Sequence, residues 1–284
     1  MKKILLLCLA IFLTTGCSLQ KDDLENATIY TTVYPIEYLI NTLYKDYSTV
    51  SSIYPTGADI KNYELTKKQI KKYADAHLFI YNGLSNEKNI TKNLINENKN
   101  LLIIDVSYGL SYTYGIEELW MSPNNYLMLA KNIRDHLTEY LDSKLIIESV
   151  NEKYNSFAET ISLMDADLRA IGKEATKKDT NTLVVTNDIF KFLTNYGFNI
   201  ISLDQDTLSE ATLSNMIKGF QKETYNSIII SDNEVPEEIA KVIEKDKITK
   251  IHISTMIQNP NIEEDYIIQM QRFIDNIRNL VLSD

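Results

Sequence analysis

Few side chains in this sequence have types and spacing suited to chemistry. The chain contains three histidines and two cysteines, and no G-x-S-x-G, P-loop or H-E-x-x-H motif occurs in it. His77 precedes an apolar run and is predicted to be a core histidine, while His136 is predicted to be solvated on an exposed helix face. His252 lies near the end of the last expected strand and is either a ligand or a structural residue. The absence of catalytic motifs predicts a protein that is not an enzyme.

The amino terminus indicates export. Lys2 and Lys3 precede the apolar run 4–13, which is too short to span a bilayer and is typical of a signal peptide. The run ends in the segment TTGCS at residues 14–18. A small residue before a cysteine at this place is typical of the bacterial lipobox. The alternative is an ordinary cleavage site followed by an incidental cysteine.

We predict that Cys17 is lipidated and becomes the first mature residue. Residues 1–16 are then the signal peptide, and residues 17–26, which are mostly polar, form a tether between the lipid and the globular part. Because Cys8 lies in the removed segment, the mature chain has no cysteine left for a disulfide, a thiol nucleophile or a metal site.

The composition excludes some classes of protein. Hydrophobic residues make up 44% of the chain and charged residues 24%, which is typical of a packed globular protein. The formal net charge is −10, and it becomes −12 without Lys2 and Lys3. Such an acidic chain lacks the clustered Lys and Arg that nucleic-acid binding requires, so no nucleic-acid partner is expected.

Short apolar, β-branched runs alternate with helical periodicity along the mature chain. Strands are expected at 27–34, 50–54, 77–81, 101–106, 182–186, 198–203, 227–231 and 250–253. Helices are expected at 35–44, 66–74, 122 to about 145, 188–196, 210–221, 236–245 and 263–282. Continuous apolar strands that alternate with helices are typical of parallel sheets with helices on their faces.

One long segment without Gly or Pro separates the two halves. Its apolar residues recur every three or four positions, at Val150, Tyr154, Phe157, Ile161, Met164, Leu168 and Ile171. This spacing predicts an amphipathic helix of about 34 Å, which we interpret as a rigid connector, although an ordinary core helix would show the same pattern. The expected fold class is α/β, with two mainly parallel, helix-flanked lobes joined by one long helix. The expected divisions are 27–149 for the N-terminal lobe, 150–178 for the connecting helix and 179–284 for the C-terminal lobe.

Several short motifs follow one another along the mature chain. They are YPTGAD at 54–59, YE at 63–64, AD at 74–75, YNGL at 81–84, LWMSP at 119–123, YN at 154–155, VT at 185–186 and YG at 196–197. In order and spacing they resemble the solute-binding lipoproteins of zinc and manganese ABC importers. The resemblance implies two α/β lobes joined by one helix, a lipid anchor on the outer face of the cell membrane, and a membrane permease and an ATPase as partners. It also implies zinc or manganese as the divalent cation bound.

The sequence departs from this family at the four positions where the resemblance implies metal ligands. Lys61 and Glu118 stand where the family has histidines, and Asn187 stands where it has His or Glu. The fourth position, usually Asp, falls at about Ser254. Zinc and manganese prefer His, Cys or carboxylate ligands, so Glu118 is the best single candidate, and an ammonium at the first position would repel a cation.

Other side chains offer alternatives near these positions. Glu117, Asp188 and His252 could supply ligands, although Asp188 is also explained as a first-turn acidic residue that complements a helix dipole. Lys61 and Glu118 could instead pair with each other in the space that the metal would fill, or Lys61 could point to solvent.

Two functions follow from these observations. The first is the extracytoplasmic solute-binding lipoprotein of an ABC importer of the metal-uptake type, with an altered ligand set and an unassigned cargo. The second is a non-transport surface lipoprotein, adhesive or regulatory, that retains the scaffold without binding metal. Lipid anchor, lobes and connector are common to both.

Overall fold

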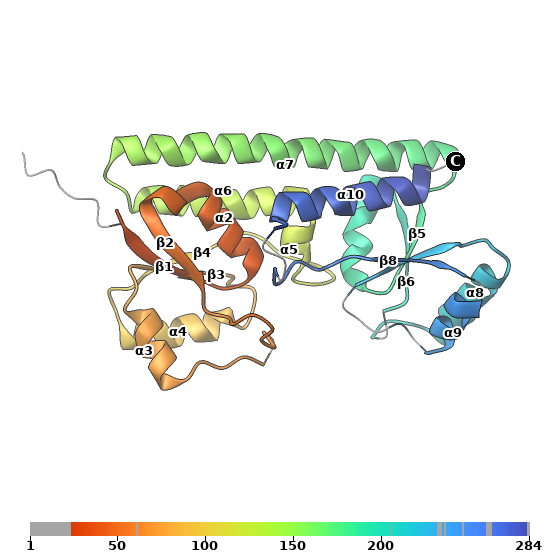
Figure 1. Cartoon of the computed structure of the whole chain (residues 1–284), viewed down its shortest axis with the longest axis horizontal. Helices are drawn as coiled ribbons and strands as arrows, with labels where there is room; N and C mark the ends of the chain where they lie inside the picture. The colour runs from red at the N-terminus through yellow and green to blue at the C-terminus, as the bar shows by residue number, and fades with distance from the viewer. Residues whose placement is uncertain are drawn as a thin grey trace, which may run out of the picture.

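The computed structural model describes residues 24–60, 62–204, 206–231, 235, 237–245, 247–259 and 263–282. The expected signal peptide, Cys17 and Lys61 lie outside the described residues. Two α/β lobes lie side by side below one long helix, α7 (Lys144–Lys178), as Figure 1 shows. The predicted fold class is confirmed. None of the described helices is both long enough and apolar enough to cross a bilayer.

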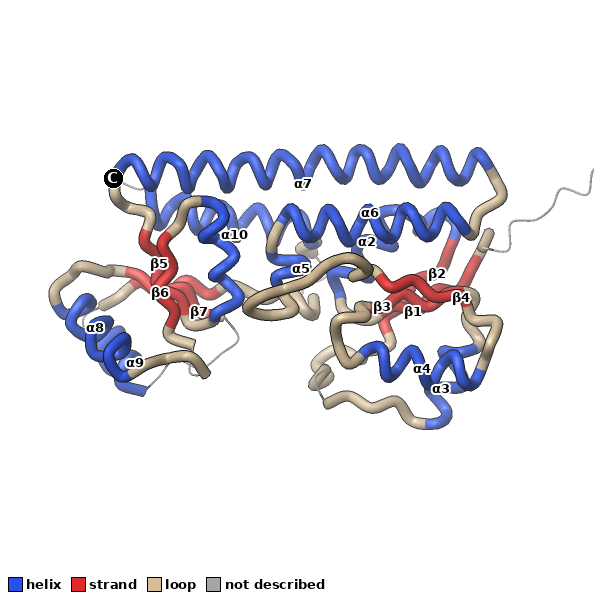
Figure 2. Tube along the Cα trace, turned by 180° about the vertical axis from the view of Figure 1, so that it is seen from behind, coloured by secondary structure: helices blue, strands red, loops and turns tan. Residues whose placement is uncertain are grey.

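The first lobe is a four-stranded parallel sheet with helices on both faces. Its strands lie in the order β2-β1-β3-β4 and comprise β1 (Ala27–Thr31), β2 (Ser48–Ser52), β3 (Leu78–Tyr81) and β4 (Leu102–Asp105). Its helical segments are α2 (Tyr34–Tyr44), η1 (Lys45–Tyr47), α3 (Lys67–Ala74), α4 (Glu87–Glu97), α5 (Glu118–Met121) and α6 (Pro123–Glu139). Figures 1 and 2 both place α2 and α6 on the side of the sheet toward α7, and α3 and α4 on the opposite side.

The second lobe repeats this topology. Its strands lie in the order β6-β5-β7-β8 and comprise β5 (Thr182–Val185), β6 (Asn199–Ser202), β7 (Ser227–Ile230) and β8 (Thr249–His252). Its helical segments are η2 (Asp188–Tyr196), α8 (Glu210–Gln221), α9 (Glu237–Lys245) and α10 (Tyr266–Leu282). In each lobe, the strand that comes first along the chain (β1 or β5) therefore lies between the strands that come second and third. No sequence repeat relates the two halves.

The connecting helix is longer than predicted. α6 ends at Glu139 instead of near Leu145, and α7 begins at Lys144, where the Ser143 hydroxyl oxygen accepts the Ile146 N–H at 3.4 Å. The prediction for the end of α6 was wrong because this boundary is a serine cap, without the Gly or Pro that marks most breaks. α7 is 35 residues long and ends where Asp179 adopts a left-handed conformation.

One hydrophobic core runs through both lobes along α7. It includes Ile133 of the first lobe, Leu168 of α7, and Phe190 and Phe273 of the second lobe, whose rings stack with centroids 6.2 Å apart. Within α7, a Cβ on Gly172 would lie 1.9 Å from the Tyr196 carbonyl oxygen, so only glycine permits this close approach of helix and lobe. Continuous packing of this kind favours a rigid relation between lobes and connector.

The chain returns to the first lobe after β8. The Trp120 indole N–H donates to the Thr255 carbonyl at 2.7 Å, and the Tyr266 hydroxyl donates to the Trp120 carbonyl. The rings of Tyr126 and Tyr266 stack with centroids 3.9 Å apart. Residues far apart in the sequence thus complete the side of the first lobe that faces the second.

Two histidine predictions can be compared with the structure. His77 is exposed and lies one residue before β3, so the prediction of a core histidine was wrong, although its Nδ1 accepts the Thr28 N–H at 3.0 Å. His136 lies on α6 with about a third of its side chain exposed, and its Nδ1 is 3.4 Å from Glu139 Oε2. Neither His77 nor His136 is one of the candidate metal ligands predicted from the sequence.

Candidate functional site

The carboxylate of Glu118 is bound to backbone amides of its own loop. Oε1 accepts the N–H groups of Gly115, at 2.9 Å, and of Tyr114, and Oε2 accepts that of Thr113 at 3.4 Å. The side chain is buried, with 6% of the residue exposed. Hydrogen bonds to an ionised carboxylate are strong, so Glu118 holds the 113–115 loop against the start of α5. The best single candidate for a metal ligand is therefore already committed to a structural role in this conformation.

Asn187 and Asp188 begin η2 in the second lobe. The Asn187 Oδ1 accepts the Ile189 N–H at 2.9 Å and caps the 3-10 helix. The Asp188 Oδ2 is 2.7 Å from Lys191 Nζ and accepts the Thr207 hydroxyl at 3.1 Å. Burial raises the pKa of Asp188, but the ion pair with Lys191 and the hydrogen bonds outweigh it and hold the pKa below its usual value. Both side chains stabilise the turn into η2.

The loop held by Glu118 meets the start of η2. A Cβ on Gly115 would lie 2.5 Å from Ile189 Cγ2, and Lys191 Nζ lies 5.4 Å from the centroid of the Tyr114 ring. The family ligand positions at Glu118 and Asn187 thus belong to two segments that contact each other across the lobes. What holds these segments together is packing and a cation–π contact.

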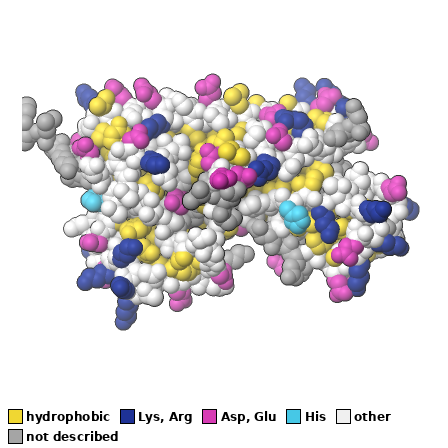
Figure 3. Space-filling view, viewed as in Figure 1, with side chains coloured by type: hydrophobic (Ala, Val, Ile, Leu, Met, Phe, Trp, Pro, Cys, Tyr) yellow, Lys and Arg dark blue, Asp and Glu magenta, His cyan; other side chains and the backbone are white. Residues whose placement is uncertain are grey.

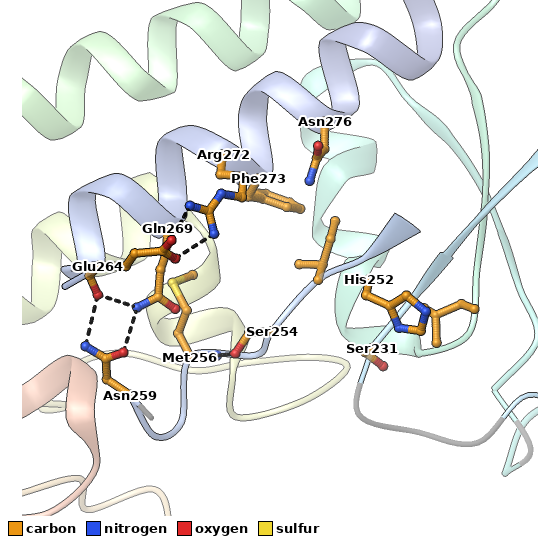
Figure 4. A pocket seen from close by; sticks show the side chains of 12 residues that line it. Ser231, His252, Ser254, Met256, Asn259, Glu264, Gln269, Arg272, Phe273 and Asn276 are labelled. Atoms are coloured by element: carbon orange, nitrogen blue, oxygen red, sulfur yellow. Dashed lines mark hydrogen bonds and ion pairs between the residues drawn. The ribbon is translucent and has the colours of Figure 1, made fainter. Parts of the chain in front are cut away.

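Ser254 and His252 line one pocket in the second lobe. This pocket of about 400 Å³ lies at the carboxyl ends of β7 and β8, where open parallel sheets commonly bind ligands. Both side chains are exposed, and the Ser254 hydroxyl oxygen accepts the Met256 N–H at 3.0 Å. Opposite them, Arg272 forms a two-point ion pair with Glu264, with both N–O distances 2.6 Å (Figure 4).

Glu117 lines a different cavity, in the first lobe. This cavity has a volume of about 290 Å³ and also contains the carboxyl group of Glu87, the first residue of α4. Sequence reasoning missed Glu87, because an acidic residue in a first helical turn is ordinary and nothing in its spacing signals burial. The structure therefore separates Glu117 from Ser254 and His252, which line another pocket.

No metal-binding cluster is formed by the residues that the structure describes. Among them, no group of three or more His, Cys, Asp or Glu side chains could hold a metal ion. Three of the four family ligand positions are described, and their side chains are Glu118, Asn187 and Ser254, each with a backbone hydrogen bond. The described residues therefore do not present the ligand set of a zinc or manganese site.

On the face shown in Figure 3, Lys and Arg are mostly interspersed with Asp and Glu. The exception is α3, which carries four exposed lysines, Lys67, Lys68, Lys71 and Lys72. Many charged side chains form local pairs, such as Lys131 with Asp135 on α6 and Arg169 with Asp165 on α7. Such exposed pairs contribute little to stability.

Similar proteins identify the family. Over 239 residues the chain is 25% identical to the iron-binding protein YfeA of Yersinia pestis, covering 79% of this chain and 75% of that protein. It is 24% identical to the manganese ABC transporter substrate-binding lipoprotein ScaA of Streptococcus gordonii, covering 92% and 90% of the two chains.

Solved structures show the same fold. The zinc-bound ZnuA-like domain of AdcA from Streptococcus pneumoniae superposes with a TM-score of 0.73 at 19% identity, covering 90% of this chain and 99% of that one. The metal-dependent lipoprotein YcdH of Bacillus subtilis gives a TM-score of 0.74 at 18% identity, with the same coverage. Residues 29–280 match the family described as zinc-uptake complex component A, periplasmic, and the chain belongs to this family.

Proposed function

We propose that this protein is the extracytoplasmic solute-binding lipoprotein of an ABC importer and acts by binding a solute, not by catalysis. Family membership, the two-lobe fold and relatives named as substrate-binding lipoproteins of metal ABC transporters support the proposal. In this role the chain is anchored through Cys17 to the outer face of the cell membrane. It delivers its cargo to a permease whose transport is driven by an ATPase.

The cargo is not zinc or manganese held by the family ligand set. The observation that carries this part is the Glu118 carboxylate, which accepts three backbone N–H groups and holds the 113–115 loop. Coordination of a cation would compete with these bonds. Asn187 and Ser254 offer a neutral amide and a hydroxyl, which are weak ligands for either metal.

Metal-dependent melting tests this assignment. A ligand that binds the folded state raises the melting temperature, so the parent protein is expected to show no shift with zinc or manganese chloride. A variant with Lys61→His, Glu118→His, Asn187→Glu and Ser254→Asp is expected to be stabilised by either metal, relative to its own metal-free melting temperature. Clear stabilisation of the parent by micromolar zinc or manganese would overturn the assignment and indicate ordinary metal capture.

Anchoring and partners need separate measurements. Cys17→Ser is expected to release the protein into the medium or to leave it unprocessed, whereas unchanged partitioning into the detergent phase would contradict the lipid anchor.

Cross-linking in intact cells followed by mass spectrometry is expected to identify an ABC permease. If no permease is captured and solute uptake survives loss of the protein, the chain is a surface lipoprotein without a transport role.

A further inference from the structure

A cavity of about 290 Å³ lies at the carboxyl edge of the first lobe's sheet. Val33 follows β1, Tyr54 follows β2, and Asn82 follows β3, and all three line it. Ile257, from the segment after β8, closes another side, and its carbonyl accepts the Tyr34 N–H at 3.2 Å. The cavity is thus lined by segments from both halves of the chain, and its volume is near the lower limit for small-molecule sites.

A buried carboxyl group faces this cavity. Glu87 is 4% exposed, and its Oε2 accepts the Asn82 N–H at 2.7 Å. The Ser85 hydroxyl donates to the Asn82 carbonyl, and its oxygen accepts the Glu87 N–H. Burial raises the pKa of the carboxyl group by more than the side chains of Thr32 and Ser85 lower it. Among the described residues, neither Glu87 nor Glu117 has an ion-pair partner within 4.0 Å. Ionisation of a buried carboxyl group without a cation nearby is costly, so above about pH 7, where Glu87 loses its proton, the cavity favours a positively charged occupant.

The other walls are apolar and aromatic. The Trp120 indole N–H donates to the Thr255 carbonyl, so the side chain offers the cavity its aromatic ring and no free hydrogen-bond donor. Tyr54 lines the same cavity as Glu87, and burial, followed by the charge of Glu87, raises the pKa of its phenol. Aromatic faces attract organic cations, whereas a hydrated metal ion needs polar partners for its waters.

We propose that this cavity binds a small organic cation, with an ammonium group paired to Glu87 and an apolar body against Trp120, Tyr54 and Ile257. Binding itself does not depend on the proposed function, but the identification of this ligand as the importer's cargo does.

Calorimetric titration of the mature chain at pH 8, above the raised pKa of Glu87, tests the proposal with defined ligands. Benzylammonium is expected to bind at least about tenfold more tightly than the neutral benzyl alcohol, since only the ammonium can pair with a carboxylate. Glu87→Gln is expected to remove this difference. Glu97→Gln, at the exposed far end of the same helix, is the matched control and is expected to leave binding unchanged.

If the parent does not distinguish benzylammonium from benzyl alcohol, or if Glu87→Gln binds like the parent, the proposal is wrong. Failure of binding leaves the importer assignment intact, whereas binding without any captured permease contradicts only the transport role.

Discussion

Gln258 is hydrogen-bonded through both ends of its side-chain amide to the turn at Gly57, two hundred residues earlier in the chain. The Gly57 N–H donates to Gln258 Oε1 at 2.9 Å, and Gln258 Nε2 donates to the Ala58 carbonyl at 3.0 Å. This turn immediately precedes the first family ligand position. A residue of the segment after β8 therefore orders a loop of the first lobe.

Gln258→Ala should free this turn. We expect a loss of about 1 kcal/mol in the free energy of unfolding, because the bonds are partly solvated, and faster hydrogen exchange at the Gly57 amide. Gln258→Glu keeps the acceptor and is the matched control. Equal protection of that amide in the parent and in Gln258→Ala would show that the turn is ordered without Gln258.

Glu118→Ala should destabilise the protein by about 2 kcal/mol in urea unfolding, because three backbone N–H groups lose their acceptor. Glu118→Gln retains one side-chain oxygen and should cost about half as much. Glu117→Ala, the neighbouring residue without such bonds, should stay within about 0.5 kcal/mol of the parent. Similar losses for the alanine variants at 117 and 118 would contradict the structural role of Glu118.

The stability of the protein should depend on pH through Glu87. Burial raises the pKa of this carboxyl group to about 7, although hydrogen bonds from the Asn82 N–H and nearby hydroxyls lower it. Between pH 4.5 and 7 the unfolded chain has lost the proton while the folded protein keeps it, so rising pH favours unfolding. Relative to Glu87→Gln, the parent should lose up to about 3 kcal/mol across this interval and nothing further above it. A constant difference between the two proteins from pH 4 to pH 8 would refute the raised pKa.

Gly172→Ala should be destabilising although alanine is the better helix former. The gain in helix propensity is about 1 kcal/mol, but the new Cβ would lie 1.9 Å from the Tyr196 carbonyl and force α7 away from the second lobe. We expect a net loss of about 2 kcal/mol or more in thermal or urea unfolding. Unchanged or increased stability would mean that α7 can shift without breaking its packing.

Small-angle scattering should show little compaction when a ligand binds. The core that runs along α7 and the absence of a break within this helix leave no hinge between the lobes. Curves of the mature chain with and without saturating benzylammonium should nearly superpose. A large fall in the radius of gyration would require a hinge at a place that these contacts do not reveal.

Much of the fold could be predicted from the sequence because several of its strands are short apolar runs. Each of the eight predicted strands overlaps one of the described strands, and the signal is clearest where buried residues are aromatic or β-branched, such as Phe79 and Ile80 in β3 and residues 228–230 in β7. α4 was not predicted, because its buried positions include Glu87 and Thr91, which hide the apolar periodicity. The boundary between α6 and α7 was missed because its only signal is Ser143.

The site was harder to predict, for a physical reason. The family ligand positions were assigned from motif order, and that assignment stays a prediction. The role of Glu118 depends on how the 113–115 loop closes on it, and a loop leaves no periodic signal. His252 and Ser254 were expected near the cleft, and both line the lobe-two pocket. Whether any of these side chains binds cargo remains a proposal.

The return of the chain after β8 has a consequence for the order in which the protein folds. Trp120 bonds to residues 135 and 146 positions later in the sequence, so the first lobe cannot complete its packing until the last part of the chain is present. Contacts of such long sequence separation form slowly, because a long loop must close before they are made. In the exported protein that we propose, the chain would remain incompletely folded while its amino-terminal half crosses the membrane, and its native state would form only after the carboxyl-terminal part has followed.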